Sequence, residues 1–221
     1  VSLFYFSFSD CPVISSVVRL STQREKDKMT LYIFDMGGVV ANDTDVFPSV
    51  FNHLKITAKQ FYGVAGSSLE RLSNGKISTD DFWKRFSSRI GKEVTEDLFS
   101  IFFKPCLDIK VVAILKELKD NARVICGTNT FDPHYDYLVL GGYYDLFDAV
   151  YASNKMGVSK PNLDFYRYIL MSEGVKPEDT VFIDDSEENV VSAKKLGIHT
   201  IWFRDAVSLR SEIELNYLTL R

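Results

Sequence analysis

Two short apolar segments that each end on carboxylates constrain the fold of this chain more than any other feature. The first, Leu31–Phe34, runs directly into Asp35 and is soon followed by two glycines that allow a sharp turn. The second, Thr180–Ile183, runs into Asp184 and Asp185. If both are parallel strands, their carboxyl ends meet at one edge of a sheet, where three carboxylates repel one another without a cation. The pattern therefore predicts a magnesium site beside a carboxylate that can act as a nucleophile.

From residue 29 onward, short apolar segments alternate with longer segments of helical periodicity. Five segments have the continuous apolar character of strands buried on both faces: Leu31–Asp35, Arg123–Gly127, Ala149–Ala152, Thr180–Asp184 and His199–Phe203. Strands that alternate with helices of this length pair in parallel through right-handed crossovers. We therefore predict an α/β fold with a Rossmann-like three-layer core, whose ligand site lies at the carboxyl ends of the strands.

The connection that follows Asp35 is far longer than a usual crossover. Within it, apolar residues recur at helical spacing after an Asn-Gly turn: Phe82, Phe86 and Ile90. This pattern predicts a helical cap domain at residues 46–106, inserted between the first and second strands. The Rossmann-like core would then comprise residues 29–45 and 107–221.

Residues 1–28 precede the first predicted strand, and their last part is polar and charged. We expect an N-terminal extension that is non-native or disordered, with an edge strand around Leu3–Phe6 as the alternative. The most apolar stretch, Val1–Leu20, is interrupted by a proline and two charged residues, so the sequence predicts no membrane span.

Charge and cysteine content argue against several classes of protein. The formal net charge is -4, which gives no general attraction to nucleic acid, and we expect none as a partner. Cys11, Cys106 and Cys126 are an odd number without a close pair, which argues against a disulfide framework or a zinc cluster and fits a reducing compartment. We therefore expect a cytoplasmic location. The sequence specifies no oligomeric state.

Two further segments carry polar groups to the same edge of the predicted sheet. The second strand is followed by Thr128 and Asn129, which offer a hydroxyl and an amide. Proline is favoured as the first residue of a helix, so we predict that Pro161 begins one and that Lys160 lies at a loop–helix junction facing the same cleft. A carboxylate nucleophile, a lysine and a metal site together suit phosphoryl transfer, because positive charge lets an anionic nucleophile approach a phosphate.

These motifs, in this order, resemble the haloacid dehalogenase (HAD) superfamily of aspartate-nucleophile hydrolases from Met29 to about Phe203. The resemblance rests on four motifs: Phe34–Val39, Thr128-Asn129, Lys160-Pro161 and Asp184–Asn189. Within the superfamily, the chain is similar to bacterial sugar-phosphate phosphatases, including those that act on glucose 1-phosphate. The resemblance implies Mg²⁺-dependent hydrolysis of a small phosphorylated metabolite, such as an anomeric phosphate.

The resemblance also implies a role for each matched residue. Asp35 would attack phosphorus and form an aspartyl-phosphate. Thr128, Asn129 and Lys160 would bind the phosphoryl oxygens, and Lys160 would also balance the charge on the nucleophile. Mg²⁺ would be bound by a set of four ligands: Asp35, the backbone carbonyl of Gly37, Asp184 and Asp185.

The chain departs from the family pattern at Gly37, where phosphatases of the family usually carry an aspartate that moves a proton. Loss of a general acid or base costs about 10²–10⁴ in rate. The enzyme could act on esters with an easier leaving group, with Asn42, Asp43 or Asp45 supplying the proton through water. It could instead be a catalytically silent phosphoester-binding protein. A third option is a 2-haloacid dehalogenase, which the retained acidic pair argues against.

Basic and aromatic residues of the predicted cap have two interpretations each. Four basic residues could meet a second charged group of a substrate, although a solvated helix face is the more ordinary interpretation: Arg71, Lys76, Arg85 and Arg89. Four aromatic residues fit the interior of the cap better than a sugar-stacking surface: Tyr62, Phe82, Trp83 and Phe86.

Overall fold

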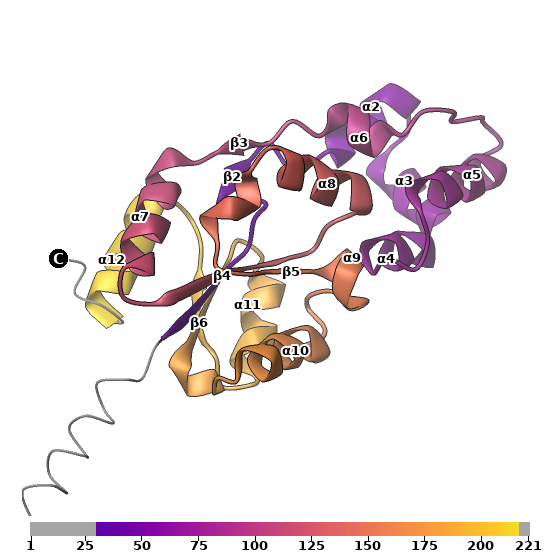
Figure 1. Ribbon diagram of the computed structural model, residues 1–221. Coiled ribbons are helices and arrows are strands. Elements are labelled where there is room, and N and C mark those ends of the chain that lie inside the picture. The colour runs from indigo at the N-terminus through magenta and orange to yellow at the C-terminus, as the bar shows by residue number, and fades with distance from the viewer. Residues whose placement is uncertain (1–29, 217–221) are drawn as a thin grey trace, which may run out of the picture.

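A computed structural model describes residues 30–216, so the predicted extension at residues 1–28 lies outside the described residues (Figure 1). The core is a parallel sheet with strand order β5-β4-β1-β6-β7. Its strands are β1 (Leu31–Phe34), β4 (Arg123–Thr128), β5 (Val150–Ala152), β6 (Thr180–Asp184) and β7 (His199–Trp202). The predicted α/β fold with a Rossmann-like core is confirmed.

Alternate residues of the central strand face opposite layers of helices, as expected of a strand buried on both faces. Leu31 and Ile33 pack in one apolar cluster with residues of α10 and α11, and Tyr32 and Phe34 pack in another with residues of α7 and α12. Figure 1 shows these two pairs of helices on either side of the sheet. Their bounds are α7 (Ile109–Lys119), α10 (Leu163–Glu173), α11 (Glu187–Lys194) and α12 (Ala206–Asn216).

The remaining helices between β4 and β6 lie in the connections between strands. They are α8 (Asp132–Leu140), α9 (Ser153–Met156) and two 3-10 helices at Tyr143–Leu146 and Pro177–Asp179. Among the helices of residues 30–216, none combines the length and apolar character that a membrane crossing needs.

Five helices lie along the chain between β2 (Ala41–Asn42) and β3 (Cys106–Leu107), two short strands that form an antiparallel pair and that the sequence did not reveal. The helices are α2 (Phe47–Leu54), α3 (Ala58–Ala65), α4 (Ser67–Ser73), α5 (Thr79–Ile90) and α6 (Leu98–Phe102). Figure 1 shows α3, α4 and α5 on the far side of α9 from the sheet. We propose that residues 46–106 form a cap domain.

The inserted helices are held together by aromatic packing. Phe99 lies at the centre, with its ring centroid 5.3 Å from that of Phe82 and 4.6 Å from that of Trp83. Phe82, Trp83 and Phe86 are all buried, whereas Tyr62 is 48% exposed. The interior interpretation of these aromatic residues therefore holds for three of the four.

Candidate active site

Asp35 lies where β1 ends, in line with the adjoining ends of β4 and β6. Its backbone N–H donates to the carbonyl of Ile183 at 2.9 Å, which continues the β1–β6 pairing by one residue. Its carboxylate oxygen Oδ1 accepts a hydrogen bond from the Met36 N–H at 2.7 Å. The residue is only 9% exposed, so the strand end presents a largely buried carboxylate.

Lys160 places a buried ammonium between two carboxylates. Its Nζ lies 3.0 Å from Oδ1 of Asp35 and 2.7 Å from Oδ2 of Asp184, and it donates to the carbonyl of Gly127 at 2.9 Å. The Lys160 side chain is 1% exposed. One ammonium thus joins the strand ends of β1, β4 and β6.

The loop that carries Lys160 differs from the prediction in one respect. Helix α10 begins at Leu163 with Asn162 as its N-cap, so the prediction that Pro161 is the first helical residue is wrong. The side-chain oxygen of Asn162 accepts the N–H of Asp164, so the helix is capped by the residue directly after the proline. Lys160 nevertheless faces the predicted cleft.

Asn129 fixes the backbone on which the lysine sits. Its side-chain amide donates to the carbonyl of Lys160 at 2.9 Å, and its side-chain oxygen accepts the Lys160 N–H at 2.9 Å. Thr128, the last residue of β4, is buried, and its hydroxyl donates to the carbonyl of Asn129 at 3.4 Å. The structure therefore brings both predicted phosphate-binding residues to the β4 end of the site, with Asn129 also positioning Lys160.

The acidic pair divides into a buried and an exposed member. Asp184 is fully buried, and its Oδ1 accepts the Ser186 N–H at 2.8 Å and the Asn189 side-chain amide at 3.0 Å. Asp185 is exposed to the cleft and approaches Gly38 so closely that a Cβ there would lie 2.2 Å from its Oδ2. Gly38 also has a φ of +75°, which L side chains rarely adopt, so the backbone of this turn favours glycine.

The electrostatics of the cluster follow from burial and mutual repulsion. Burial raises the pKa of the Asp35 carboxyl to about 7 although Lys160 opposes the rise, and Asp184 adds to it. Burial alone would lower the pKa of Lys160, but Asp35 and Asp184 raise it to about 12. Burial and the neighbouring Asp184 also raise the pKa of Asp185. The site is therefore short of positive charge.

These carboxylates fit a divalent cation. One oxygen of each of Asp35, Asp184 and Asp185 lies within 4.8 Å of the other two. Opposite oxygen ligands of Mg²⁺ are about 4.2 Å apart, so a single ion fits this spacing with little movement. With Lys160 counted, three carboxylates and one ammonium leave a net charge of −2, which one divalent ion neutralises. Gly37, the fourth predicted ligand, lines the same cavity as Asp35 and Asp185.

Thr44 occupies the space that a side chain at Gly37 would fill. A Cβ at Gly37 would lie 2.8 Å from the Thr44 hydroxyl oxygen. The chain reaches this position through Asp43, whose φ of 57° is left-handed and turns the backbone back toward the strand end. A threonine hydroxyl, rather than an aspartate, thus lies next to Gly37.

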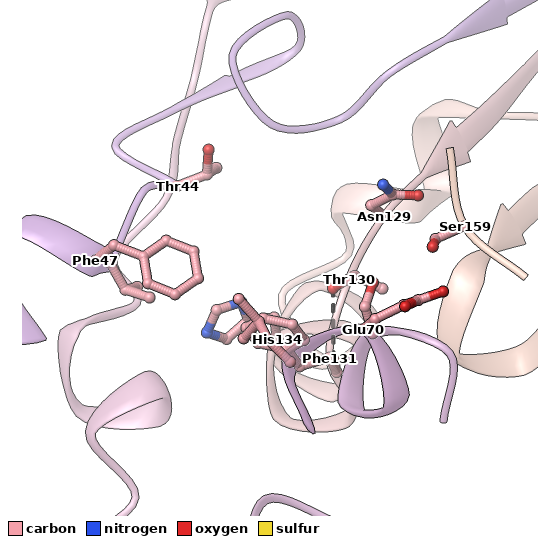
Figure 2. Close-up of a pocket in the computed structure, with 11 residues that line it drawn as sticks. Thr44, Phe47, Glu70, Asn129, Thr130, Phe131, His134 and Ser159 are labelled. Atoms are coloured by element: carbon pink, nitrogen blue, oxygen red, sulfur yellow. Dashed lines mark hydrogen bonds between the residues drawn. The ribbon is translucent and has the colours of Figure 1, made fainter. Parts of the chain in front are cut away.

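Two cavities of about 440 Å³ each meet at Thr44 and Asn129. The first, the acidic cavity, is lined by Asp35 and Asp185, and its lining includes all three residues proposed as alternative proton donors: Asn42, Asp43 and Asp45. The second lies between the strand ends and helices α2 and α4, and Figure 2 shows Phe47 facing Asn129 and Ser159 across it. The surface that its residues turn inward is mostly apolar.

Sequence reasoning missed the residues of this second cavity. They are Thr44, Val46, Phe47, Leu69, Glu70, Ser73, Thr130, Phe131, His134 and Ser159, beside the predicted Asn129. His134 is buried, donates from Nε2 to the Phe99 carbonyl at 3.0 Å, and stacks on Phe103 with ring centroids 3.8 Å apart. No local motif marks these positions, because they converge only through the placement of the inserted helices.

The four basic residues of the cap lie elsewhere. None of Arg71, Lys76, Arg85 and Arg89 lines either of these two cavities. Arg89 donates to the carbonyls of Val64 and Ala65, at 3.1 and 3.3 Å, which joins α5 to the end of α3. The interpretation of these residues as a charged subsite finds no support here.

Residues 32–203 match the family described as haloacid dehalogenase-like hydrolases. A sesquiterpene phosphatase of Aspergillus oryzae is 30% identical over 188 residues, which cover 82% of this chain and 93% of that protein. A D-ribitol-5-phosphate phosphatase of Bacteroides thetaiotaomicron is 25% identical over 198 residues, covering 82% of this chain and 95% of that protein.

Solved structures give the same relationship. A HAD-like hydrolase of Porphyromonas gingivalis superposes with a TM-score of 0.71 at 26% identity, covering 86% of this chain and 100% of that chain. A variant of a HAD-family enzyme of Bacteroides thetaiotaomicron, in complex with magnesium and inorganic phosphate, superposes with a TM-score of 0.68 at 25% identity. That match covers 82% of this chain and 98% of that chain.

Proposed function

Because this chain belongs to the family of haloacid dehalogenase-like hydrolases, we propose that it is a Mg²⁺-dependent phosphatase of small phosphorylated metabolites with Asp35 as its nucleophile. The observation that carries the proposal is the contact of one buried ammonium, that of Lys160, with both Asp35 and Asp184 at 3.0 and 2.7 Å. Relatives that are phosphatases, and a structural neighbour solved with magnesium and phosphate, support it.

The chemistry would proceed in two in-line steps. The Asp35 carboxylate attacks phosphorus, a bond forms between its oxygen and phosphorus, and the bond to the leaving alcohol oxygen breaks. That oxygen takes a proton from water. A second water then attacks the phosphorus and gives a proton to the hydroxide that the first water left, which breaks the bond between phosphorus and the Asp35 oxygen, releases inorganic phosphate and restores the carboxylate of Asp35.

Each residue of the site has a part in these steps. Lys160 opposes the rise in the pKa of Asp35 that burial causes, which favours the ionised nucleophile, and its charge attracts the phosphoryl oxygens. Mg²⁺ would be held by Asp35, Asp184, Asp185 and the backbone of Gly37, and it supplies positive charge that offsets that of the phosphoryl group. Thr128 and Asn129 would bind the remaining oxygens.

Proton transfer to the leaving group would depend on water held in the acidic cavity. Gly37 offers no acid, but the Thr44 hydroxyl beside it, together with Asp43 and Asp45, can hydrogen-bond such a water. An ester with an acidic leaving group, such as an anomeric sugar phosphate, needs this help least. The relatives include a sesquiterpene phosphatase and a D-ribitol-5-phosphate phosphatase, so the comparisons support both apolar and polar leaving groups.

The test is release of inorganic phosphate from acetyl phosphate, glucose 1-phosphate and alkyl phosphates, with and without Mg²⁺. We expect Asp35→Asn to reduce Mg²⁺-dependent release by on the order of 10³-fold or more. Asp136→Asn, the same chemical change on an exposed face of α8, is the control and leaves release unchanged. Equal background from both variants and the parent would identify a silent phosphoester-binding protein. Chloride release from a 2-haloacid without metal would identify a dehalogenase.

A further inference from the structure

The cavity between the strand ends and helices α2 and α4 lies where the leaving group of a phosphoester substrate would bind. It meets the acidic cavity at Thr44 and Asn129, so a phosphoryl group beside Asp35 directs its ester substituent past these two residues. Its volume of about 440 Å³ falls within the range of about 300–1,000 Å³ typical of small-molecule sites. The walls of this cavity therefore select the substituent.

The apolar walls come from both the inserted helices and the core. Val46 and Phe47 contribute from the start of α2, Leu69 from α4 and Phe131 from the segment after β4. Figure 2 shows the Phe47 ring turned toward the space opposite Asn129. Burial of a substituent's carbon atoms against these side chains is favourable in proportion to the area removed from water.

The charged groups of this cavity disfavour a second anion. None of the eleven described residues that line it is lysine or arginine. His134 adds no positive charge at neutral pH, because burial lowers its pKa to about 4. The one charged side chain in the lining is that of Glu70, on α4, and Figure 2 shows it on the same side of the cavity as Ser159.

We propose that the preferred substrates are phosphomonoesters of uncharged, largely apolar alcohols, whose hydrocarbon part lies between Phe47, Leu69 and Phe131, and that Glu70 rejects leaving groups with a second negative charge. This inference rests on the proposed phosphatase function, since it takes the acidic cavity to be the site of the phosphoryl group. It assigns Glu70, on α4, as a specificity-determining residue.

Alkylphosphonates test this proposal because their carbon–phosphorus bond resists hydrolysis. We expect calorimetry in the presence of Mg²⁺ to give a Kd that falls by roughly fourfold for each added methylene, from ethyl- through butyl- to octylphosphonate, until the cavity is filled. Phosphonobutanoate, in which a carboxylate replaces the terminal methyl group of butylphosphonate, should bind at least about tenfold more weakly than butylphosphonate.

Glu70→Lys tests the charge effect without disturbing the core, because Glu70 is exposed on α4. This variant should reduce the preference for butylphosphonate over phosphonobutanoate by about tenfold or more. Glu93→Lys makes the same change at an exposed position outside the cavity and should leave the preference as it is. An unchanged preference in Glu70→Lys, or a change of equal size in Glu93→Lys, overturns the role of Glu70.

The two proposals fail in different ways. Hydrolysis of acetyl phosphate, whose small substituent needs no apolar cavity, reports on the proposed function through its loss in Asp35→Asn. If acetyl phosphate is hydrolysed but ethyl- and octylphosphonate bind equally well, or phosphonobutanoate binds best, the phosphatase remains and the apolar substrate class is wrong. If octylphosphonate binds tightly but no ester is hydrolysed, the cavity is as inferred and the proposed turnover is wrong.

Discussion

Replacement of Lys160 by methionine tests the electrostatic argument at the centre of the site. Methionine keeps most of the length and volume of the lysine stem and removes the ammonium. The ammonium nitrogen lies 3.0 Å from Oδ1 of Asp35 and 2.7 Å from Oδ2 of Asp184, and the Lys160 side chain is 1% exposed. The variant therefore leaves two buried carboxylates without their shared counter-charge.

The expected loss of stability follows from burial. Removal of one partner of a buried ion pair costs about 3–5 kcal/mol, because the remaining charge stays desolvated. The cost applies to one carboxylate only, because Asp35 can take up a proton once the Lys160 ammonium, which lowers its pKa, is removed. For a chain of this size, about 3–5 kcal/mol corresponds to a fall in Tm of roughly 6–20 °C.

Lys155→Met is the matched control. Lys155 also pairs with an aspartate, Asp132, at 2.8 Å, but the two side chains are 49% and 48% exposed. An exposed pair contributes about 0–1 kcal/mol, so the control should change the Tm by no more than about 4 °C. The two variants thus compare similar ion-pair distances at opposite extremes of burial.

Magnesium separates the charge effect from lost packing. With all three carboxylates ionised, as Mg²⁺ binding requires, the cluster has a net charge of −2 with Lys160 and −3 without it, so the increase in Tm on adding Mg²⁺ should be larger in Lys160→Met than in the parent. Thermal unfolding followed by circular dichroism, with EDTA or with excess Mg²⁺, measures both quantities. A Tm loss no greater than that of Lys155→Met, or a smaller Mg²⁺ effect in Lys160→Met, would refute the reasoning.

Three further predictions concern stability, measured by urea denaturation. Burial lowers the pKa of His134 to about 4, so between about pH 6.5 and pH 4 the imidazole takes up a proton in the unfolded chain but not in the folded chain. The free energy of unfolding should therefore fall by about 2 kcal/mol between pH 7.5 and pH 5, and His134→Gln should flatten this decline. Gly37→Ala places a Cβ 2.8 Å from the Thr44 hydroxyl and should cost about 1–3 kcal/mol, most of which Thr44→Ala restores in the double variant. Phe99→Ala removes the central ring of the inserted helices and should cost about 3–5 kcal/mol. An unchanged pH profile, additive effects at the glycine–threonine pair, or a cost below about 1 kcal/mol at the phenylalanine contradicts the respective prediction.

The strand ends were predictable because two simple signals coincide there. Continuous apolar segments identify buried strands, and parallel pairing places all their carboxyl ends at one edge. Asp35 and Asp184 therefore come together through topology alone, and the register of β1 against β6 pairs the residues just before them, Phe34 and Ile183. Strand boundaries were predicted to within one residue for the same reason.

The turn after β1 could not be predicted because its geometry depends on contacts between short segments. The two-residue strands β2 and β3 carry no measurable alternation, and they pair across the whole insert. The return of Thr44 to Gly37 requires a left-handed residue at Asp43, which the sequence permits but does not demand. Gly37 lacks an acidic side chain, and the hydroxyl of Thr44 occupies the space beside it.

The substrate cavity was hidden for a different reason. A cap residue reaches the site according to how its helix is placed, and spacing within the helix does not reveal that placement. Arg89 shows this, since its guanidinium bonds to carbonyls at the end of α3, whereas Glu70 of α4 reaches the cavity. The sequence therefore does not show which charged residue of the cap reaches the cavity.

The two halves of the site meet at Asn129, and this contact links specificity to chemistry. Asn129 lines both cavities, and its side chain bonds to the N–H and the carbonyl of Lys160. A substituent that presses on Asn129 from the apolar cavity therefore acts on the segment that holds the ammonium 3.0 Å from Asp35. Since about 1 Å of misplacement in such a site can cost 10²-fold in rate, the fit of the leaving group should affect turnover as well as binding.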